Sequence, residues 1–226
     1  IQYREIISFK INKIKKEASL FWINEVIYDF KVPRTIQYNN ENYLVTSIIR
    51  CQNLFGSLQF EENSAVHTFY KSGFRSSHVK LIYIPDNLKT IKERCFMYAD
   101  DLVKFIISPK NDRFTFKDDR YLLGKTDEKS ANFDVLLYAT KKITEAKISS
   151  DIKIISSYAF CNCKNLQKVT IEENSKLEII GESAFSSSVI EEIFIPSKVT
   201  QIFDDAFYEC QSLQKVRIEK DSKLEI

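Results

Sequence analysis

The amino-acid sequence predicts a repeat solenoid of mostly short parallel strands joined by short helical turns. Two long segments share one pattern, because AFCNCKNLQKVTIEENSKLEI from Ala159 is followed by AFYECQSLQKVRIEKDSKLEI from Ala206. A phenylalanine directly after a small residue also recurs, at intervals of 22 or 25 residues wherever no insertion intervenes. Recurrence at a nearly fixed period indicates stacked structural units. The recurring phenylalanines are Phe74, Phe96, Phe160, Phe185 and Phe207.

Each unit contains the motif L-x-x-V-x-I, as in Leu166, Val169 and Ile171. The apolar residues at its end alternate with polar ones, which predicts a short strand with Val and Ile inward and Lys168 and Thr170 outward. Parallel strands from successive units are expected to form one sheet. A period of about 20–29 residues with this motif is typical of a leucine-rich repeat solenoid.

The recurring phenylalanine is predicted to lie in the core between stacked coils. The residue before it is Gly73, Cys95 or Ala159 in three units and alanine again in the other two, and such small residues suit a close approach of backbones. Each ring would then stack on the next as a ladder, and burying one stabilises the fold by roughly 1.5–3 kcal/mol.

The cysteines are predicted to be structural. Five of them at irregular spacing do not form a disulfide framework. Cys163 and Cys210 stand three residues after a ladder phenylalanine, where another unit has Ala99, so we predict a buried slot for a small side chain. Cys161 is predicted to point outward from its helical turn. The C-x-C spacing lacks the second ligand pair of a zinc site, and no metal is expected.

Residues 1–47 lack the repeat signature and are predicted to form an N-terminal β cap. Four apolar stretches are typical of strands, with a hairpin turn beginning at Asn39–Asn40, and Trp22 is expected to fill the core of the cap. A basic run beside them is either a solvated strand edge or a contact for a polyanion. The run comprises Lys10, Lys13, Lys15 and Lys16.

Residues 48–226 carry the repeats, with an interruption at about 109–145. Within it, RFTF and RYLLG flank the turn signal Asp118–Asp119, and VLLYA returns after a polar loop, which predicts an inserted β-hairpin. The chain starts without methionine and stops at Ile226 in the middle of a unit. We therefore expect it to be a piece of a longer protein, truncated mid-repeat.

The composition argues against several classes of function. The 33 basic and 31 acidic residues leave a net charge of +2, which gives no support for a nucleic-acid partner. No run of about eighteen apolar residues is present, so no membrane span is expected in this fragment. The chain lacks P-loop, G-x-G-x-x-G, G-x-S-x-G and H-E-x-x-H motifs, and neither enzymatic activity nor a cofactor is expected.

The outward positions of the stacked strands are the candidate binding face, because solenoids often bind partners there. Tyr83, Ile106 and Phe194 place large apolar side chains where solvent is expected, as protein-binding hot spots do. Alternatively, the inserted hairpin, a second copy of the chain or further repeats cover them, and scattered exposed apolar residues are ordinary. The candidate partner-binding residues are Leu81, Tyr83, Ile106, Lys147, Thr170, Phe194 and Arg217.

The sequence resembles the BspA-like leucine-rich repeat proteins. The resemblance rests on AF-x-x-C-x-x-L-x-x-V-x-I, on IPSKVTQIFDDAF from Ile195 and on IPDNLKTIKERCF from Ile84. It implies a curved right-handed solenoid and a surface or secreted protein of bacteria or of anaerobic protists such as Trichomonas and Entamoeba. It brings no catalytic residues. We therefore expect a non-catalytic, adhesin-like solenoid that contacts a host or matrix protein, with an intracellular scaffold as the alternative.

Overall fold

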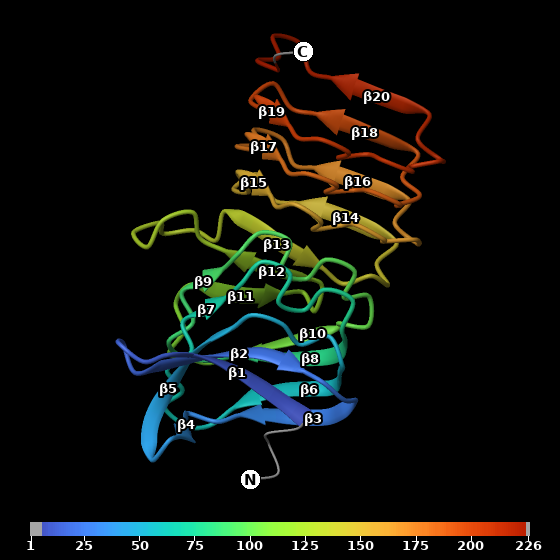
Figure 1. Ribbon diagram of the computed structural model, residues 1–226. Coiled ribbons are helices and arrows are strands. Elements are labelled where there is room, and N and C mark those ends of the chain that lie inside the picture. The colour runs from blue at the N-terminus through green and yellow to red at the C-terminus, as the bar shows by residue number, and fades with distance from the viewer. Residues whose placement is uncertain (1–5, 225–226) are drawn as a thin grey trace. The chain divides into compact units, whose positions relative to one another are not determined.

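The computed structural model describes residues 6–224, which form twenty strands in two compact units (Figure 1). The first unit ends at Asp112 and the second begins at Arg113. Each unit contains one sheet of longer parallel strands and a second sheet in which two-residue strands continue from an antiparallel hairpin. Each repeat contributes one strand to each sheet, as β16 (Lys168–Ile171) and β17 (Ile179–Ile180) do.

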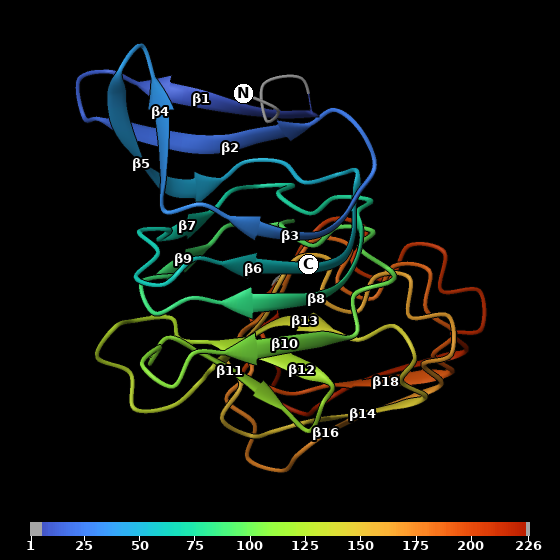
Figure 2. The same cartoon turned by 90° about the horizontal axis from the view of Figure 1, so that it is seen from below.

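In the first unit, four parallel strands lie side by side in the order β10-β8-β6-β3 (Figure 2). The other sheet runs β1-β2-β5-β7-β9, with β4 paired to β5. The four parallel strands are β3 (Ile27–Val32), β6 (Leu54–Phe60), β8 (His78–Ile84) and β10 (Lys104–Ile107). The other strands are β1 (Ile7–Asn12), β2 (Glu17–Ile23), β4 (Thr35–Tyr38), β5 (Glu41–Ile48), β7 (Thr68–Phe69) and β9 (Thr90–Ile91).

In the second unit, the parallel sheet has the order β14-β16-β18-β20, and the other sheet runs β11-β12-β13-β15-β17-β19. The additional parallel strands are β14 (Glu145–Ile148), β18 (Glu192–Ile195) and β20 (Lys215–Ile218). The other sheet adds β11 (Phe114–Lys117), β12 (Tyr121–Gly124), β13 (Val135–Ala139), β15 (Ile154–Ile155) and β19 (Gln201–Ile202).

The prediction of a solenoid with parallel strands is confirmed, but the prediction of one continuous sheet is wrong. Strands β10 and β14 belong to two different four-stranded sheets. The physical reason is the insertion between them. The chain there forms the antiparallel strands β11, β12 and β13 instead of the next parallel strand, so a new parallel stack starts at β14.

The prediction of short helical turns is also wrong, because the segments around the ladder phenylalanines form consecutive hydrogen-bonded turns. Around Phe160, the N–H groups of Ala159, Cys161 and Cys163 each donate to the carbonyl three residues earlier. The residues two before and two after each ladder phenylalanine have positive φ, which a right-handed helix excludes and type II turns require. These pairs are Ser72 and Ser76, Arg94 and Tyr98, Tyr158 and Asn162, Ser183 and Ser187, and Asp205 and Glu209.

This turn geometry lets the phenylalanine N–H bond to the next coil. The N–H of Phe160 donates to the carbonyl of Ala184 at 2.7 Å, and that of Phe185 donates to Ala206 at 2.8 Å. Phe74 donates to Cys95 in the same way, also at 2.8 Å. Within each unit the turns therefore form a third strip of hydrogen bonds between coils, beside the two sheets.

The predicted phenylalanine ladder is confirmed within each unit. The ring centroids of Phe160 and Phe185 are 5.0 Å apart with an interplanar angle of 5°, and Phe185 stacks on Phe207 at 5.5 Å and 3°. In the first unit, Phe74 stacks on Phe96 at 5.6 Å. Space before the ring is limited, because a Cβ on Gly73 would lie 3.1 Å from the carbonyl oxygen of Tyr70, a tight contact.

Two coils without the signature place a small residue at the ladder position. The N–H of Cys51 donates to the carbonyl of Gly73 at 2.7 Å, and that of Ala139 donates to Ala159 at 2.9 Å, so both occupy the place of a ladder phenylalanine. Beside Ala139, the ring of Tyr121 packs edge-on against Phe160 with centroids 6.3 Å apart. An aromatic ring from the inserted hairpin therefore extends the ladder.

The slot three residues after the ladder phenylalanine is confirmed as a small-residue site, because Cys163 and Ala99 are fully buried. Cys210 lies in the same slot of the last repeat, is only partly buried, and its Sγ is 3.1 Å from the carbonyl oxygen of Phe185. The prediction for Cys161 is wrong: its side chain is buried, because the helical geometry that would have turned it outward is not formed. All five cysteines are free thiols, and burial raises the pKa of Cys95 well above its ordinary value.

The N-terminal strands lie where the sequence places them. The loop between β4 and β5 is Asn39–Asn40, and both residues have positive φ, as a two-residue type I′ hairpin loop requires. Trp22 does not fill the core as expected. It is half-buried, and the guanidinium of Arg50 lies 4.7 Å from its ring centroid. The role of residues 1–47 as a cap remains our interpretation.

The inserted hairpin turns at Asp118 and Asp119, both with positive φ, between β11 and β12. The polar loop before β13 is held by Asp134, whose buried carboxylate accepts hydrogen bonds from the N–H and Oγ1 of Thr126, both at 2.8 Å. The Nζ of Lys153 lies 3.2 Å from the same carboxylate. Burial opposes ionisation, but these hydrogen bonds and the ammonium group hold the pKa of Asp134 below its usual value.

The ladder predicts that Phe185→Ala destabilises the second unit by about 3–5 kcal/mol, because the ring is fully buried between two others. Phe207→Ala is the matched control and should cost clearly less, since Phe207 is only partly buried in the last repeat. Urea unfolding monitored by circular dichroism measures both. An equal or reversed ranking would contradict the ladder assignment.

The Asp134 network predicts a pH-dependent contribution to stability. A lowered pKa in the folded state means that the contribution is fully present above the ordinary value of 3.8 and is lost as pH falls through the folded value. Asp134→Asn should therefore lower the free energy of unfolding at neutral pH, and the difference from wild type should shrink below about pH 3.8. A difference that is constant with pH would show that the ionised carboxylate does not stabilise the loop.

Candidate protein-binding surfaces

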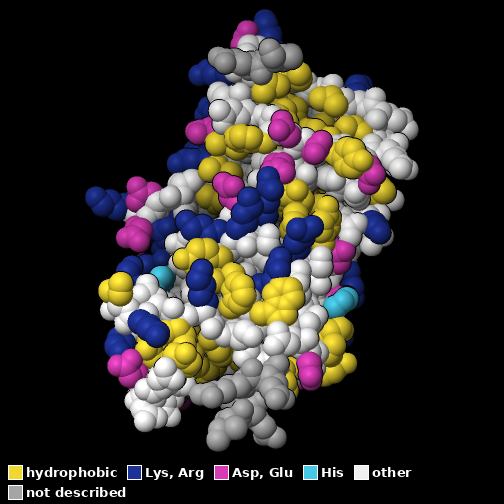
Figure 3. All heavy atoms as spheres, viewed as in Figure 1, with side chains coloured by type: hydrophobic (Ala, Val, Ile, Leu, Met, Phe, Trp, Pro, Cys, Tyr) yellow, Lys and Arg dark blue, Asp and Glu magenta, His cyan; other side chains and the backbone are white. Residues whose placement is uncertain are grey.

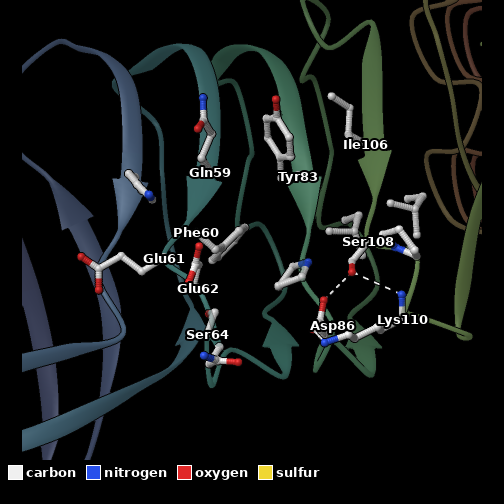
Figure 4. Close-up of a pocket in the computed structure, with 16 residues that line it drawn as sticks. Gln59, Phe60, Glu61, Glu62, Ser64, Tyr83, Asp86, Ile106, Ser108 and Lys110 are labelled. Atoms are coloured by element: carbon white, nitrogen blue, oxygen red, sulfur yellow. Dashed lines mark hydrogen bonds and ion pairs between the residues drawn. The ribbon is translucent and has the colours of Figure 1, made fainter.

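The outward face of the first unit's parallel sheet carries an uncharged row across three neighbouring strands. Tyr83 on β8 pairs in register with Ile106 on β10, and Leu81 pairs with Lys104. Gln59 on β6 points the same way as Tyr83 and Ile106 (Figure 4). The side chains of Tyr83 and Ile106 are half-buried, although solvent lies on this side of the sheet. The row therefore offers an aromatic and an aliphatic contact on a rigid parallel sheet.

A groove with a volume of about 530 Å³ runs along this row and the strand ends that follow it. Its apolar lining includes Phe60, Pro85 and Ile107 besides the row itself. Its rim is charged. Asp86 accepts a hydrogen bond from the Oγ of Ser108 and lies 3.9 Å from the Nζ of Lys110. An apolar centre within a polar rim is the arrangement of a protein interface.

The rest of the rim combines the acidic Glu61 and Glu62, labelled in Figure 4, with the basic Lys31. Glu61 and Glu62 lie at the end of β6, and Glu61 accepts a hydrogen bond from the N–H of Arg34 at 2.7 Å. Sequence reasoning selected Leu81, Tyr83 and Ile106 but missed this rim. The rim residues lie just after the repeat motif, where the spacing of apolar residues carries no signal.

The outward face of the second unit's parallel sheet is more polar than that of the first. Lys147 pairs in register with Thr170, and Phe194 pairs with Arg217. Phe194 is 40% exposed and is the large apolar side chain of this row. The neighbouring row alternates in charge from strand to strand and reads Glu145, Lys168, Glu192 and Lys215.

Ion pairs neutralise part of the charge on this face. The Nζ of Lys147 lies 2.9 Å from Glu172, and the guanidinium of Arg217 lies 2.9 Å from Glu192. Lys147 and the N–H of Ser150 lower the pKa of Glu172. Exposed pairs of this kind contribute little to stability and are compatible with a solvated face. The seven predicted residues therefore divide between two sheets of unlike chemistry, three in the first unit and four in the second.

Sequence reasoning also missed a row of contacting rings at the start of the first unit's parallel strands. The ring of Phe55 lies 5.4 Å from that of Tyr28 and 4.5 Å from that of His78. The Nδ1 of His78 is 2.8 Å from Asp101. Phe55 and His78 stand about one repeat apart in the chain, so aligning the irregular repeats would have revealed the pair. The face in view in Figure 3 shows hydrophobic and charged side chains interspersed.

The repeats match a known family over most of the chain. The family model for the BspA type leucine rich repeat region matches residues 49–118 and 134–225, in six copies. The chain belongs to the BspA-type leucine-rich repeat family. The segment between the two matched ranges contains the loop held by Asp134. No curated protein sequence matches the chain.

Solved structures of leucine-rich repeat proteins are similar to this BspA-type chain. A leucine-rich repeat protein from Eubacterium ventriosum is 19% identical, with 96% of this chain and 71% of that chain covered and a TM-score of 0.61. A leucine rich cell surface protein from Faecalibacterium prausnitzii is 14% identical, with 95% and 93% covered and a TM-score of 0.44. The similarity to the Eubacterium ventriosum structure supports the leucine-rich repeat fold. Among residues 6–224, no helix has the length and apolar character needed to cross a membrane.

Proposed function

We propose that the chain is a non-catalytic, protein-binding leucine-rich repeat solenoid of the cell surface or secreted space, which contacts a host or matrix protein as an adhesin does. One observation carries the proposal: the row formed by Gln59, Tyr83 and Ile106 beside a groove with an apolar centre and a charged rim. Leucine-rich repeats are typically non-catalytic and serve protein–protein interaction. Within the described residues, no group of acidic, histidine and cysteine side chains is arranged to hold a metal.

The chemistry of the row favours a protein partner. A tyrosine and an isoleucine held on adjacent strands present a large contact area at a low cost in conformational entropy, because the sheet already fixes their backbones. The charged rim would exclude water and orient the partner without contributing most of the binding energy. The second unit's face would contribute Phe194 and Arg217, beside Lys147 and Thr170, as a separate and more polar contact.

The surface location rests on the family, since BspA-type leucine-rich repeat proteins are often surface-associated. An intracellular scaffold that uses the same face is the second candidate. It is favoured by the five free thiols, including the partly exposed Cys210, because secreted proteins more often form disulfides. Antibody labelling of intact against permeabilised cells separates the two locations.

Binding of the wild-type chain to immobilised fibronectin, laminin, collagen and fibrinogen, and to detergent extracts of epithelial cells, tests the proposed face. Tyr83→Ser with Ile106→Ser should weaken the interaction more than tenfold, as loss of hot-spot residues does. Phe194→Ser, measured separately, reports whether the second unit contributes.

Tyr70→Ser is the matched control, because Tyr70 is an exposed tyrosine of the first unit that follows β7 in the other sheet. It should bind as wild type does. Retained binding by the Tyr83 and Ile106 variant, or an equal loss in the control, would contradict the assignment. Sedimentation velocity of the wild type shows whether a second copy of the chain covers the face instead.

A further inference from the structure

The loop that joins β1 and β2 presents an apolar side chain almost entirely to solvent. This β1–β2 loop comprises Lys13, Ile14, Lys15 and Lys16, and the side chain of Ile14 is 97% exposed. Scattered exposed apolar residues are ordinary, but Ile14 has nearly no contact with the rest of the protein. The loop extends beyond the strands that it joins in both Figure 1 and Figure 2.

Local hydrogen bonds fold the loop into a tight turn. The Oδ1 of Asn12 accepts hydrogen bonds from the N–H groups of Ile14 and Lys15, both at 3.2 Å. Asn12 and Glu17 pair at the base of the loop, and Lys16 takes a positive φ that closes it. These contacts set the backbone geometry of the turn, and the exposure of Ile14 follows from that geometry.

Positive charge surrounds Ile14. Lys10, Lys13, Lys15 and Lys16 are all exposed. One of them is neutralised, since the Nζ of Lys16 lies 2.5 Å from Glu41 of the neighbouring β4–β5 hairpin. The ion pairs of the described residues include none for Lys10, Lys13 or Lys15. Glu17 at the end of the loop and Glu41, which also attracts Lys13, offset part of this charge, so lysines exceed carboxylates by four to two around the loop.

A second exposed apolar residue lies at the base of the loop. The N–H of Leu44 donates to the carbonyl of Lys16 at 3.0 Å, and the side chain of Leu44 is 40% exposed. The β1–β2 loop thus combines a protruding aliphatic tip, flanking lysines and an apolar neighbour. Peripheral membrane attachment uses the same two attractions, burial of apolar groups and attraction to anionic lipids.

We propose that the β1–β2 loop docks on an anionic lipid surface, with Ile14 entering the boundary between headgroups and acyl chains and the lysines contacting lipid phosphates. A sulfated polysaccharide would satisfy the lysines, but it offers an aliphatic side chain no apolar environment. A bilayer satisfies both. The docking is weak and reversible, because one aliphatic residue and a partly neutralised group of lysines provide only a small attraction. It is independent of the proposed protein-binding face.

Cosedimentation with vesicles tests the docking. The wild-type chain should bind vesicles containing about one-third phosphatidylglycerol in phosphatidylcholine, and binding should weaken with added salt. It should not bind vesicles of phosphatidylcholine alone. Lys13→Gln with Lys15→Gln should lower the partition coefficient roughly 25-fold, at about fivefold for each lysine. Ile14→Ser should lower it roughly tenfold, since the apolar tip no longer leaves water.

Lys142→Gln with Lys164→Gln is the matched control, because it removes the same charge from exposed lysines of the second unit. It should bind as wild type does. An equal loss in this control would show non-specific attraction and overturn the proposal. Unchanged vesicle binding by Ile14→Ser, or retention on heparin without vesicle binding, would also overturn it, in favour of a polyanion contact. Circular dichroism of each variant confirms folding.

Discussion

The backbone hydrogen bond from the ladder residue to the next coil is the constraint on which the repeat depends. The N–H of Phe185 can donate to Ala206 only because the residues two positions away on each side adopt positive φ and keep the segment out of a helix. The same geometry directs the phenylalanine ring into the core. One local conformation therefore connects neighbouring coils through the backbone and stacks their rings.

Coils that lack the ladder phenylalanine still form the hydrogen bond to the next coil, with a smaller side chain at the ladder position. Ala139 occupies the ladder position at the start of the second unit's stack, and the ring of Tyr121 packs beside it against Phe160. The insert between β10 and β14 thus ends the parallel sheet of the first unit. Its strands β11, β12 and β13 belong to the second sheet of the second unit. Each unit presents its own outward face as a result. One has a groove lined by apolar side chains, and the other has alternating charges.

Much of the fold could be predicted from the sequence, because regular spacing directly reflects burial. The period-2 alternation of Val169 and Ile171 identified a strand, and Asn39–Asn40 identified a hairpin loop. The turns around Phe160 were mistaken for helices because Tyr158 and Asn162 are not glycines, so their positive φ left no compositional sign. Tyr83 and Ile106 could be found from the repeat register. The charged rim could not, since its residues follow the repeat motif in segments where apolar spacing gives no signal.

Amide hydrogen exchange at the ladder positions tests the central claim most directly. If the inter-coil hydrogen bonds hold the coils together, the amides of Phe160 and Phe185 exchange only on global unfolding of the second unit. They should then be protected as strongly as the amides inside β16. Exchange of these two amides as fast as that of the exposed loop residue Glu128 would contradict the account, because the turns would then be loose connections between two sheets.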